Sequence, residues 1–267
     1  MADNSIELRG RGKLYVGTSG WSNLTWGKGP LPKKVPPRER LARLGRIFNA
    51  VEINSTFYRL PPPGCASRWA SAVPDDFVFA VKLSRFLTHI QRLRVDPTDR
   101  GLAPFFEAVA GFGEKLGPLL AQLPPNLQKD EDLLNEFLAS IHVAMGSHHG
   151  RIAVELRHPS WRSPEITRIL DRHGAALVVA DMPACTVAEP NRGAPFVYIR
   201  RHGPEGDYRG GYTPQQIAED AALARREINA GRDVFVFYNN TIDPDAVLNA
   251  LSLLQMQSAV APRGQGF

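Results

Sequence analysis

The sequence predicts a TIM-type (β/α)₈ barrel. The length of 267 residues is close to the ~250 residues of such a domain. Eight short β-prone runs alternate along the chain with segments of helical pattern, which is typical of a parallel sheet. Residues 182–195, between the sixth and seventh runs, are too rich in proline and glycine for a full helix, so one connecting helix is expected to be degenerate or missing. An open, doubly wound sheet is the alternative.

The eight expected strands are short β-prone runs separated by polar loops. In chain order they are Leu14–Ser19, Ala50–Thr56, Phe77–Ser84, Pro118–Leu123, Arg151–His158, Ala176–Asp181, Phe196–His202 and Asp233–Asn240. The helices between them have recognisable ends. Thr213 precedes Pro214 and stands three residues before Gln216, which fits a capping box. Gly174 and Gly231 stand where helices should stop, just before the next strand.

The chain is expected to form a single barrel domain over residues 13–256, with a flexible N-terminus (1–12) and a flexible C-terminal tail (257–267). Hydrophobic residues make up 43% and charged residues 22% of the chain, a globular balance that excludes wholesale disorder. No apolar run reaches the ~18 residues of a membrane span, and the N-terminus lacks the apolar core of a secretory signal. With only Cys65 and Cys185, no disulfide framework is expected, and a reducing, cytoplasmic location follows.

Polar side chains gather at the ends of the expected strands. The outward positions of parallel strands under helices are apolar, so Val51 and Ile53 face outward. Glu52, Asn54 and Thr56 then face the barrel axis. On the other strands, further polar residues face inward by the same alternation or lie at the strand ends: Lys82, Gln122, Glu155, Arg157, Asp181, Arg200, His202 and Asn239 or Asn240. Lys82, on the adjacent strand, could pair with Glu52. Barrel enzymes place their chemistry at these strand ends, so this ring is the candidate active site; a buried ion network that only fixes strand register is the alternative.

Seven motifs together resemble one family. They are Gly17-Thr-Ser-Gly-Trp21, Glu52-Ile-Asn-Ser-Thr-Phe-Tyr-Arg59, Phe79-Ala-Val-Lys82, Thr88-His89, Gln122-Leu-Pro-Pro125, Glu155-Leu-Arg-His-Pro-Ser-Trp161 and Tyr238-Asn-Asn240. From about Tyr15 to Ala250 the chain is similar to the domain-of-unknown-function family 72, the YecE-like family. The resemblance implies a TIM-type barrel of cytoplasmic, mainly prokaryotic distribution with no settled activity. Where the family has Tyr-x-Arg-Leu-His-Gly, this chain has Arg201 in place of Leu, which is expected to add a cation close to the site.

Histidines and aromatic residues extend the candidate site. His89 follows the third expected strand, and His158 and His202 end the fifth and the seventh, all on the expected functional face. Trp21, Trp161 and Tyr58 lie in loops of the same face, where aromatic rings beside cations suit stacking of a base or a sugar. A lid that packs on itself is the alternative.

A divalent metal ion is conceivable on the carboxylates and imidazoles of this region: Glu155, Asp181, His158 and His202. Lys82, Arg157 and Arg200 crowd the same region, and their charges would repel a cation. The sequence therefore requires no metal or other cofactor, and the same cations favour an anion.

These residues favour an enzyme that binds an anionic, phosphate-bearing substrate and hydrolyses a phosphoester. Arg157, Arg200 and Lys82 would hold the anion. The candidate catalytic residues are a general base (Glu155 or Glu52), an acid (His89 or His202) and Lys82. Substrate contacts are expected from the other polar and aromatic residues of this face: Asn54, Thr56, Tyr58, Gln122, Arg157, His158, Trp161, Asp181, Arg200, Asn239, Asn240 and Trp21.

Three other functions are alternatives. A carbohydrate-active enzyme would use Glu52 and Glu155 as its carboxylate pair. A Schiff-base lyase or aldolase would use Lys82 as its nucleophile. A non-catalytic nucleic-acid-binding protein agrees with the net charge of +5 and the isoelectric point near 9.4, and needs a continuous basic surface outside the mouth. A small anionic molecule or a nucleic acid is thus the expected partner, with no membrane; the oligomeric state is left open.

Overall fold

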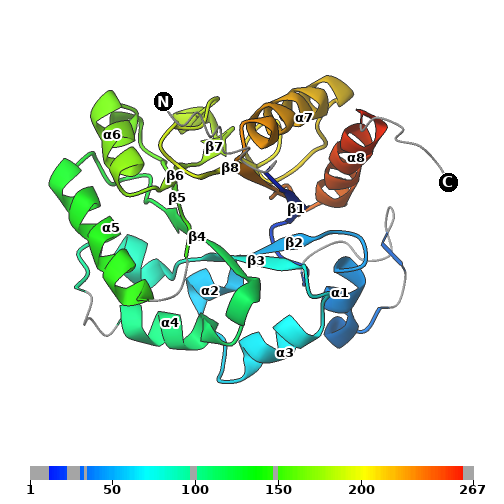
Figure 1. Ribbon diagram of the computed structural model, residues 1–267, viewed down its shortest axis with the longest axis horizontal. Helices are drawn as coiled ribbons and strands as arrows, with labels where there is room; N and C mark the ends of the chain where they lie inside the picture. Colours follow the sequence, from blue (N-terminus) through cyan, green and yellow to red (C-terminus); the bar gives the residue numbers. More distant parts are fainter. Residues whose placement is uncertain (1–11, 23–30, 33–34, 97–100, 147–149, 261–267) are drawn as a thin grey trace, which may run out of the picture.

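A computed structural model gives the structure of residues 12–22, 31–32, 35–96, 101–146 and 150–260. The strands run through the middle of the molecule and the helices surround them (Figure 1). Most of the two expected loose ends lies outside the described residues. The last helix, α8 (Asp245–Val260), covers residues 257–260, so the range predicted as a tail begins as a helix. Within the described ranges, no helix has the length and apolarity needed to cross a membrane.

Among the described residues the strands form two parallel sheets. One sheet has four strands in the order β1-β9-β8-β7, and the other has five in the order β2-β3-β4-β5-β6. Their bounds are β1 Leu14–Thr18, β2 Ala50–Ile53, β3 Val78–Lys82, β4 Leu116–Gln122, β5 Ile152–Glu155, β6 Ala176–Leu177, β7 Val179–Ala180, β8 Phe196–Arg201 and β9 Asp233–Tyr238. Each predicted strand region therefore contains a strand.

The two sheets are not joined by a continuous ladder, so the structure is an α/β fold with parallel sheets rather than the single closed sheet that the sequence predicts. At one junction, β1 and β2 share an isolated bridge between Ser19 and Glu52. At the other, the predicted sixth strand divides into β6, which pairs with β5, and β7, which pairs with β8. Val178 separates the two, and its N–H donates to the Val154 carbonyl at 3.0 Å. The ladder breaks here because the chain changes from one neighbour to the other within a few residues.

The helices confirm most of the predicted connections. Their bounds are α1 Pro37–Leu44, α2 Ser55–Tyr58, α3 Cys65–Ser71, α4 Leu102–Ala110, α5 Glu131–Met145, α6 Pro164–Arg172, α7 Pro214–Asn229 and α8, with short helical turns η1 Phe86–Ile90, η2 Gly113–Lys115, η3 Pro159–Trp161 and η4 Pro183–Cys185. Residues 182–195 are all described and contain only η4, which confirms the degenerate connection. Thr213 and Gln216 form the capping box, and Gly174 and Gly231 have φ angles of +58° and +83°.

Alternation along the strands builds an apolar layer on each side of the sheets. Outward residues such as Val51, Val81 and Ile199 belong to the main core. Inward residues form a second cluster: Ala50, Ala80, Leu120, Ala153, Ala176, Val178, Ala180, Ala194, Phe196, Tyr198, Phe235 and Phe237. Two positions further along their strands stand the polar residues Glu52, Lys82, Gln122, Glu155 and Arg200. The predicted alternation is confirmed, and it places these polar side chains directly above an apolar interior.

Gly17 lets β1 approach β2. A Cβ atom at this position would lie 2.0 Å from the Ala50 carbonyl oxygen. We expect Gly17→Ala to push the strands apart and lower the free energy of unfolding by about 1–3 kcal/mol. Urea unfolding followed by circular dichroism measures this loss. Gly45→Ala is the matched control, because its φ is −64° and a Cβ there meets side-chain atoms, the nearest at 3.1 Å. Equal losses in the two variants would contradict the role given to Gly17.

Candidate active site

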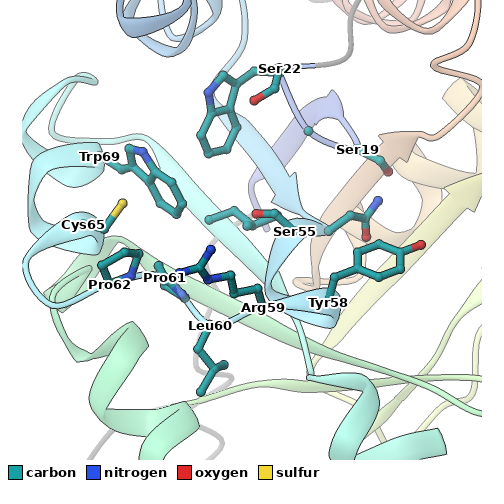
Figure 2. Close-up of a pocket in the computed structure, with 14 residues that line it drawn as sticks. Ser19, Ser22, Ser55, Tyr58, Arg59, Leu60, Pro61, Pro62, Cys65 and Trp69 are labelled. Atoms are coloured by element: carbon teal, nitrogen blue, oxygen red, sulfur yellow. The ribbon is translucent and has the colours of Figure 1, made fainter.

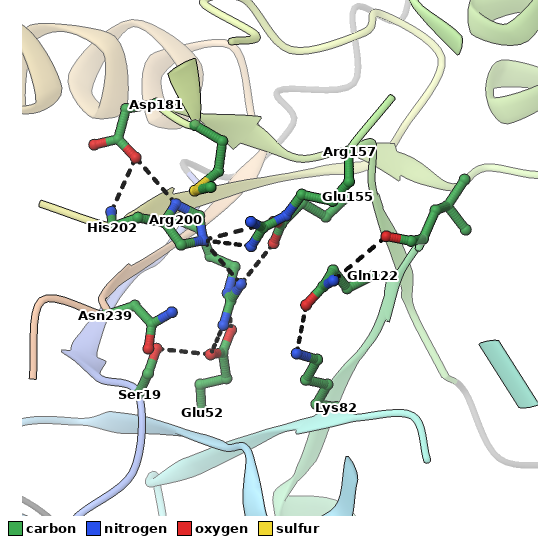
Figure 3. A network of polar contacts seen from close by, with 12 residues as sticks. Ser19, Glu52, Lys82, Gln122, Glu155, Arg157, Asp181, Arg200, His202 and Asn239 are labelled. Atoms are coloured by element: carbon green, nitrogen blue, oxygen red, sulfur yellow. Dashed lines mark hydrogen bonds and ion pairs between the residues drawn. The ribbon is translucent and has the colours of Figure 1, made fainter. Parts of the chain in front are cut away.

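Arg200, near the end of β8, is the centre of a buried ionic network (Figure 3). Its guanidinium forms a fork with Glu52, in which Nε donates to Oε2 at 2.8 Å and Nη2 donates to Oε1 at 2.7 Å. Its Nη1 donates to Oε2 of Glu155 at 2.6 Å. These three side chains are at most 1% exposed. Although burial alone would lower the pKa of Arg200, the two glutamates raise it well above its ordinary value, so the guanidinium stays charged.

Both oxygens of Glu52 are engaged. Besides the bonds from Arg200, its Oε1 accepts from the Ser19 hydroxyl and its Oε2 from the Tyr198 hydroxyl, each at 2.7 Å. Although burial alone would raise the pKa of Glu52, Arg200 and the two hydroxyls lower it. The carboxylate therefore acts as a fixed counter-ion that ties β1, β2 and β8 together.

Glu155, at the end of β5, bridges two arginines. Its Oε1 forms an ion pair with Nε of Arg157, which follows two residues later. Although burial alone would raise the pKa of Glu155, Arg200 and Arg157 lower it strongly. Glu155 is therefore ionised at physiological pH and is a weak base.

His202 follows β8 and connects the arginines with Asp181. Its Nδ1 lies 3.0 Å from Asp181 Oδ1, whereas its Nε2 lies 3.1 Å from Arg157 Nη2 and 3.0 Å from Arg200 Nη1. Guanidinium groups only donate, so Nε2 accepts and Nδ1 carries the proton that is donated to Asp181. Burial lowers the pKa of His202, in agreement with a neutral ring. The Tyr212 hydroxyl donates to the other oxygen of Asp181 and holds it in place. In this neutral state His202 orients the arginines, its one N–H is bonded to Asp181, and it is not a general acid.

Lys82, at the end of β3, stands apart from this network (Figure 3). Its Nζ donates to Gln122 Oε1 at 2.5 Å and lies 4.2 Å from the centre of the Phe57 ring. The side chain is 9% exposed. Burial, together with the positive charge of Arg200, lowers the pKa of Lys82 to about 7. Close to neutral pH a large fraction of the amine is therefore unprotonated and nucleophilic.

The predicted pairing of Glu52 with Lys82 is wrong. Glu52 pairs with Arg200, which reaches it from β8 in the other sheet, and Lys82 bonds to Gln122 on the adjacent strand. The planar guanidinium fork matches both carboxylate oxygens at once, whereas a lysine ammonium offers a point charge.

His89, in η1, lies on the Lys82 side of the site. Its ring meets Phe57 edge to face, with ring centres 4.9 Å apart. Burial and the positive charges of Lys82, Arg85 and Arg157 lower the pKa of His89 to about 4. A ring that is neutral in such surroundings is a weak acid at neutral pH, and the positive potential around it suits an anion.

Five other predicted contact residues lie in the segments that follow their strands. Asn54 and Asn239 meet across the junction of the two sheets, with Nδ2 of the first 3.5 Å from Oδ1 of the second. Tyr58 is 76% exposed, and Trp21 is buried in the wall of a neighbouring pocket. His158 begins η3 and is half-buried.

Three predicted contact residues each have a polar side-chain atom engaged in a structural bond. Thr56 Oγ1 donates to the Lys82 carbonyl at 2.7 Å and so fixes the start of α2 on β3. Trp161 is fully buried, and its Nε1 donates to the Leu127 carbonyl at 2.6 Å. Asn240 Nδ2 donates to a backbone carbonyl of the loop after β8 at 2.7 Å. These contacts order the loops, and the burial of Trp161 removes it from a platform for stacking.

Arg201 does not add a cation to the site, contrary to the expectation from the sequence. Consecutive residues of a strand point to opposite faces, so Arg201 points away from Arg200 and towards α7. There its Nε lies 3.0 Å from each carboxylate oxygen of Asp220. The Tyr238 hydroxyl donates to the same carboxylate at 3.3 Å. The residue that departs from the family pattern thus belongs to a buried ion pair between β8 and α7.

We expect Arg201→Leu to lower the free energy of unfolding by about 3–5 kcal/mol, because Asp220 would stay buried without its partner. The double variant Arg201→Leu/Asp220→Leu should recover most of this loss, since apolar groups then replace both charges. Urea unfolding of the two single variants and the double variant gives the coupling energy. Strictly additive losses would show that the two side chains do not act as a pair.

The four side chains considered for a metal ion do not converge on one point. Glu155 binds the two guanidinium groups, Asp181 accepts from His202, and His158 lies beside Ser160. Within the part of the chain that the structure describes, no three His, Cys, Asp or Glu residues are placed to hold a metal.

Sequence reasoning missed three hydroxyl groups of the network: Ser19, Tyr198 and Tyr212. Tyr198 could have been found, because it stands two residues before Arg200 and shares its inward direction. Ser19 ends the first expected strand inside a recognised motif, which is a weaker signal. Tyr212 lies in the long loop before α7, where no periodicity predicts a direction.

Comparison with known proteins places this chain in a family. The family profile described as "Protein of unknown function DUF72" matches residues 15–265. The chain belongs to the DUF72 family. It is 27% identical over 184 residues to UPF0759 protein YecE of Escherichia coli (strain K12). The aligned region covers 67% of this chain and 62% of YecE. It is 25% identical over 288 residues to UPF0759 protein YunF of Bacillus subtilis (strain 168). That aligned region covers 94% of this chain and 98% of YunF.

Solved structures of DUF72 proteins have the same fold. A family protein from Thermotoga maritima MSB8 superposes with a TM-score of 0.76 at 26% identity, over 92% of this chain and 99% of that one. A second, from Enterococcus faecalis V583, has a TM-score of 0.77 at 20% identity, over 95% and 99% of the two chains. These names state no reaction or substrate, so a function for this DUF72 chain has to be argued from the site itself.

Proposed function

We propose that this DUF72 protein is an enzyme that acts on a small, anionic carbonyl compound at the carboxyl ends of its strands, with the Lys82 amine as the reacting group. In this proposal the two sheets are the halves of a TIM-type barrel, whose carboxyl end carries the chemistry. One observation supports it best. Among the described residues, the buried arginines of the site are paired with glutamates, whereas Lys82 is bonded to the neutral amide of Gln122.

The surroundings of Lys82 favour the uncharged amine. The Phe57 ring and the apolar interior exclude water from the ammonium group, and Arg200 opposes a second positive charge. A pKa of about 7 makes the amine roughly half unprotonated at neutral pH. An ordinary lysine, with a pKa near 10.4, is unprotonated to less than about 0.1% at that pH.

The reaction step that follows from this arrangement is formation of an imine. The lone pair of Lys82 Nζ attacks the carbonyl carbon, and the electrons of the C=O bond move to the oxygen, which takes up a proton. Loss of water from this carbinolamine gives the imine, so amine and carbonyl are converted to imine and one water. The protonated imine then accepts electrons when a neighbouring bond of the substrate breaks, which is the chemistry of a Schiff-base lyase.

An anionic group on the substrate fits the positive potential next to Lys82. Arg85 is exposed and directly precedes η1. Burial and the positive charges of Lys82, Arg85 and Arg157 lower the pKa of His89. Arg200 is not available to the substrate, because its donors are taken by the two glutamates. We therefore expect the anion between η1 and the end of β5 rather than at the centre of the network.

The geometry gives less support to the other functions. The phosphoester hydrolysis predicted from the sequence and a glycosidase mechanism both use Glu52 or Glu155 as an available carboxylate, but the two glutamates are bound to one guanidinium and their pKa values are lowered. A nucleic-acid-binding surface needs continuous basic charge, whereas the exposed Glu205 and Asp207 lie on the loop after β8.

Reductive trapping tests the proposal. The protein is incubated at pH 7 with glyoxylate and sodium cyanoborohydride, and the modified lysines are identified by peptide mass spectrometry. We expect Lys82 to be modified at least roughly 100-fold faster than the exposed Lys13, because an ordinary lysine is almost fully protonated. Acetaldehyde, an aldehyde without a carboxylate, should also favour Lys82 over Lys13, because the unprotonated fraction is unchanged, but it should modify Lys82 more slowly than glyoxylate does.

Two exposed arginines provide a matched control. Arg85→Gln should reduce the preference of Lys82 for glyoxylate over acetaldehyde, whereas Arg209→Gln, on the loop after β8, should leave it unchanged. Modification of Lys82 no faster than that of Lys13 would overturn the proposal.

A further inference from the structure

A pocket of about 540 Å³ opens between the segments that follow β1 and β2 (Figure 2). Its walls are mainly apolar and aromatic, with Trp21, Trp69, Leu60, Pro61 and Pro62 among the lining residues. The indoles of Trp21 and Trp69 meet edge to face with ring centres 5.1 Å apart. A concave, largely apolar cavity of this size with a few polar groups is typical of a small-molecule site.

The polar end of this pocket adjoins the ionic network. Ser19 lines the pocket and donates to Glu52, and Asn54 lines it and lies 3.5 Å from an Arg200 nitrogen. Figure 2 shows Trp69 and Cys65 along one wall and Ser19 towards the opposite end.

The short helix α2 separates the pocket from Lys82 and contacts both. Ser55 and Tyr58 line the pocket, while Phe57 lies against the Lys82 amine. In the pairing of β2 with β3, Ile53 is opposite Val81, so Asn54 and Lys82 come next on the two strands. The pocket therefore reaches, at Asn54, the strand position next to Lys82, and a ligand has to extend past Asn54 to meet the amine.

The charge of the pocket indicates the class of ligand. Among the described lining residues, Arg59 carries the only full charge, and its side chain is exposed. An aromatic ring suits the two indoles and the prolines, and an anionic group suits the guanidinium.

We infer that this pocket binds the aromatic ring of an aromatic carboxylate, which makes an aromatic keto acid the substrate class for Lys82. The carboxylate of the keto acid then lies near η1, as in the proposed function, and Arg59 holds the carboxylate of a ligand that stays within the pocket, such as phenylacetate. The substrate class rests on the proposed function, but binding in the pocket does not, because a ring without a carbonyl should bind as well. Phenylacetate is therefore the probe for the pocket alone, and phenylpyruvate is the probe for the pocket and the amine together.

Cys65 is a natural reporter for the occupancy of this pocket. It lines the wall and is half-buried, whereas Cys185 is 1% exposed and burial raises the pKa of its thiol. Alkylation by iodoacetamide, followed by peptide mass spectrometry, should modify Cys65 and spare Cys185 in the folded protein. Saturating phenylacetate should slow alkylation of Cys65 by about fivefold or more, and acetate, which lacks the ring, should not.

Variants separate the pocket from the amine. Arg59→Gln should weaken the protection by phenylacetate, and Arg85→Gln, outside the pocket lining, should not. Lys82→Met should keep the protection in full but lose reductive trapping of phenylpyruvate. Protection without trapping in the wild type would defeat the proposed function and leave the pocket intact. Absence of protection by phenylacetate, or equal protection by acetate, would overturn the inference.

Discussion

Arg200→Ala will lower the free energy of unfolding at pH 7 by about 3–5 kcal/mol. The substitution leaves Glu52 and Glu155 ionised and fully buried above an apolar interior, without the guanidinium that now neutralises both. The loss therefore comes from the charge of Glu52, which is left without a cationic partner, and from that of Glu155, which keeps only Arg157. Urea unfolding followed by circular dichroism and by tryptophan fluorescence measures it.

The pH dependence identifies this cause. In the wild type the pKa values of Glu52 and Glu155 are lowered. The network therefore stabilises the protein above the pKa of an unfolded-state glutamate, near 4.3, and this stabilisation is lost only as pH falls well below that pKa. Without Arg200, we expect burial to raise the pKa of Glu52, so that weak acid neutralises it, whereas Arg157 still lowers the pKa of Glu155. The difference in unfolding free energy between wild type and variant should thus be smaller at about pH 5 than at about pH 8.

Two further variants complete this test. Arg200→Lys keeps a charge but loses the fork, so an intermediate loss is expected even if Arg200→Ala fails to fold. Arg209→Ala removes an exposed arginine whose Nη1 is 4.0 Å from Asp243, and should change the stability by less than about 0.5 kcal/mol. An Arg200→Ala variant as stable as Arg209→Ala would contradict the role assigned to the network.

Lys82→Met will make the protein more stable than the wild type at pH 6, and this advantage will shrink as pH rises. In the wild type the folded-state pKa of Lys82 is about 7, against about 10.4 in the unfolded chain. Between these values the unfolded state binds the proton and the folded state does not, so wild-type stability rises with pH. A shift of more than three units corresponds to about 4–5 kcal/mol over this interval.

Urea unfolding of wild type and Lys82→Met across this pH range measures the effect as a difference between two proteins. Alkaline titration of other groups cancels in that difference. Lys129→Met is the matched control, because its side chain is 33% exposed and pairs with Glu131 at the surface, so its difference from wild type should be flat with pH. A flat difference for Lys82→Met as well would show that the amine is protonated throughout.

Most of the fold could be predicted from residue patterns, because they act over short distances. Alternation between outward residues such as Val51 and inward residues such as Glu52 follows from burial under helices, and the structure confirms it. The capping box at Thr213 and the degenerate connection at residues 182–195 depend on local chemistry and are confirmed as well. The break at Val178 could not be predicted, because the identity of a strand's hydrogen-bonded neighbour is not encoded in the strand itself.

The location of the candidate site could be predicted, but the pairing of its charges could not. The inward direction of Glu52, Lys82, Glu155 and Arg200 places them on one face, but it does not show which charge pairs with which. Adjacent strands made Glu52 and Lys82 the natural pair, whereas the side chain of Arg200 is long enough to reach Glu52 from the other sheet.

Residue patterns alone were enough to predict the parallel α/β architecture, the face on which the charged residues meet, and the family. Three features emerge only from the folded chain: Arg200 neutralises two glutamates, Arg201 at the end of β8 pairs with Asp220 of α7, and Lys82 is held beside a neutral amide. The physical reason is range. Periodicity and caps act within a few residues, whereas a buried charge takes its state from groups that lie far away in the sequence and within 3 Å in space.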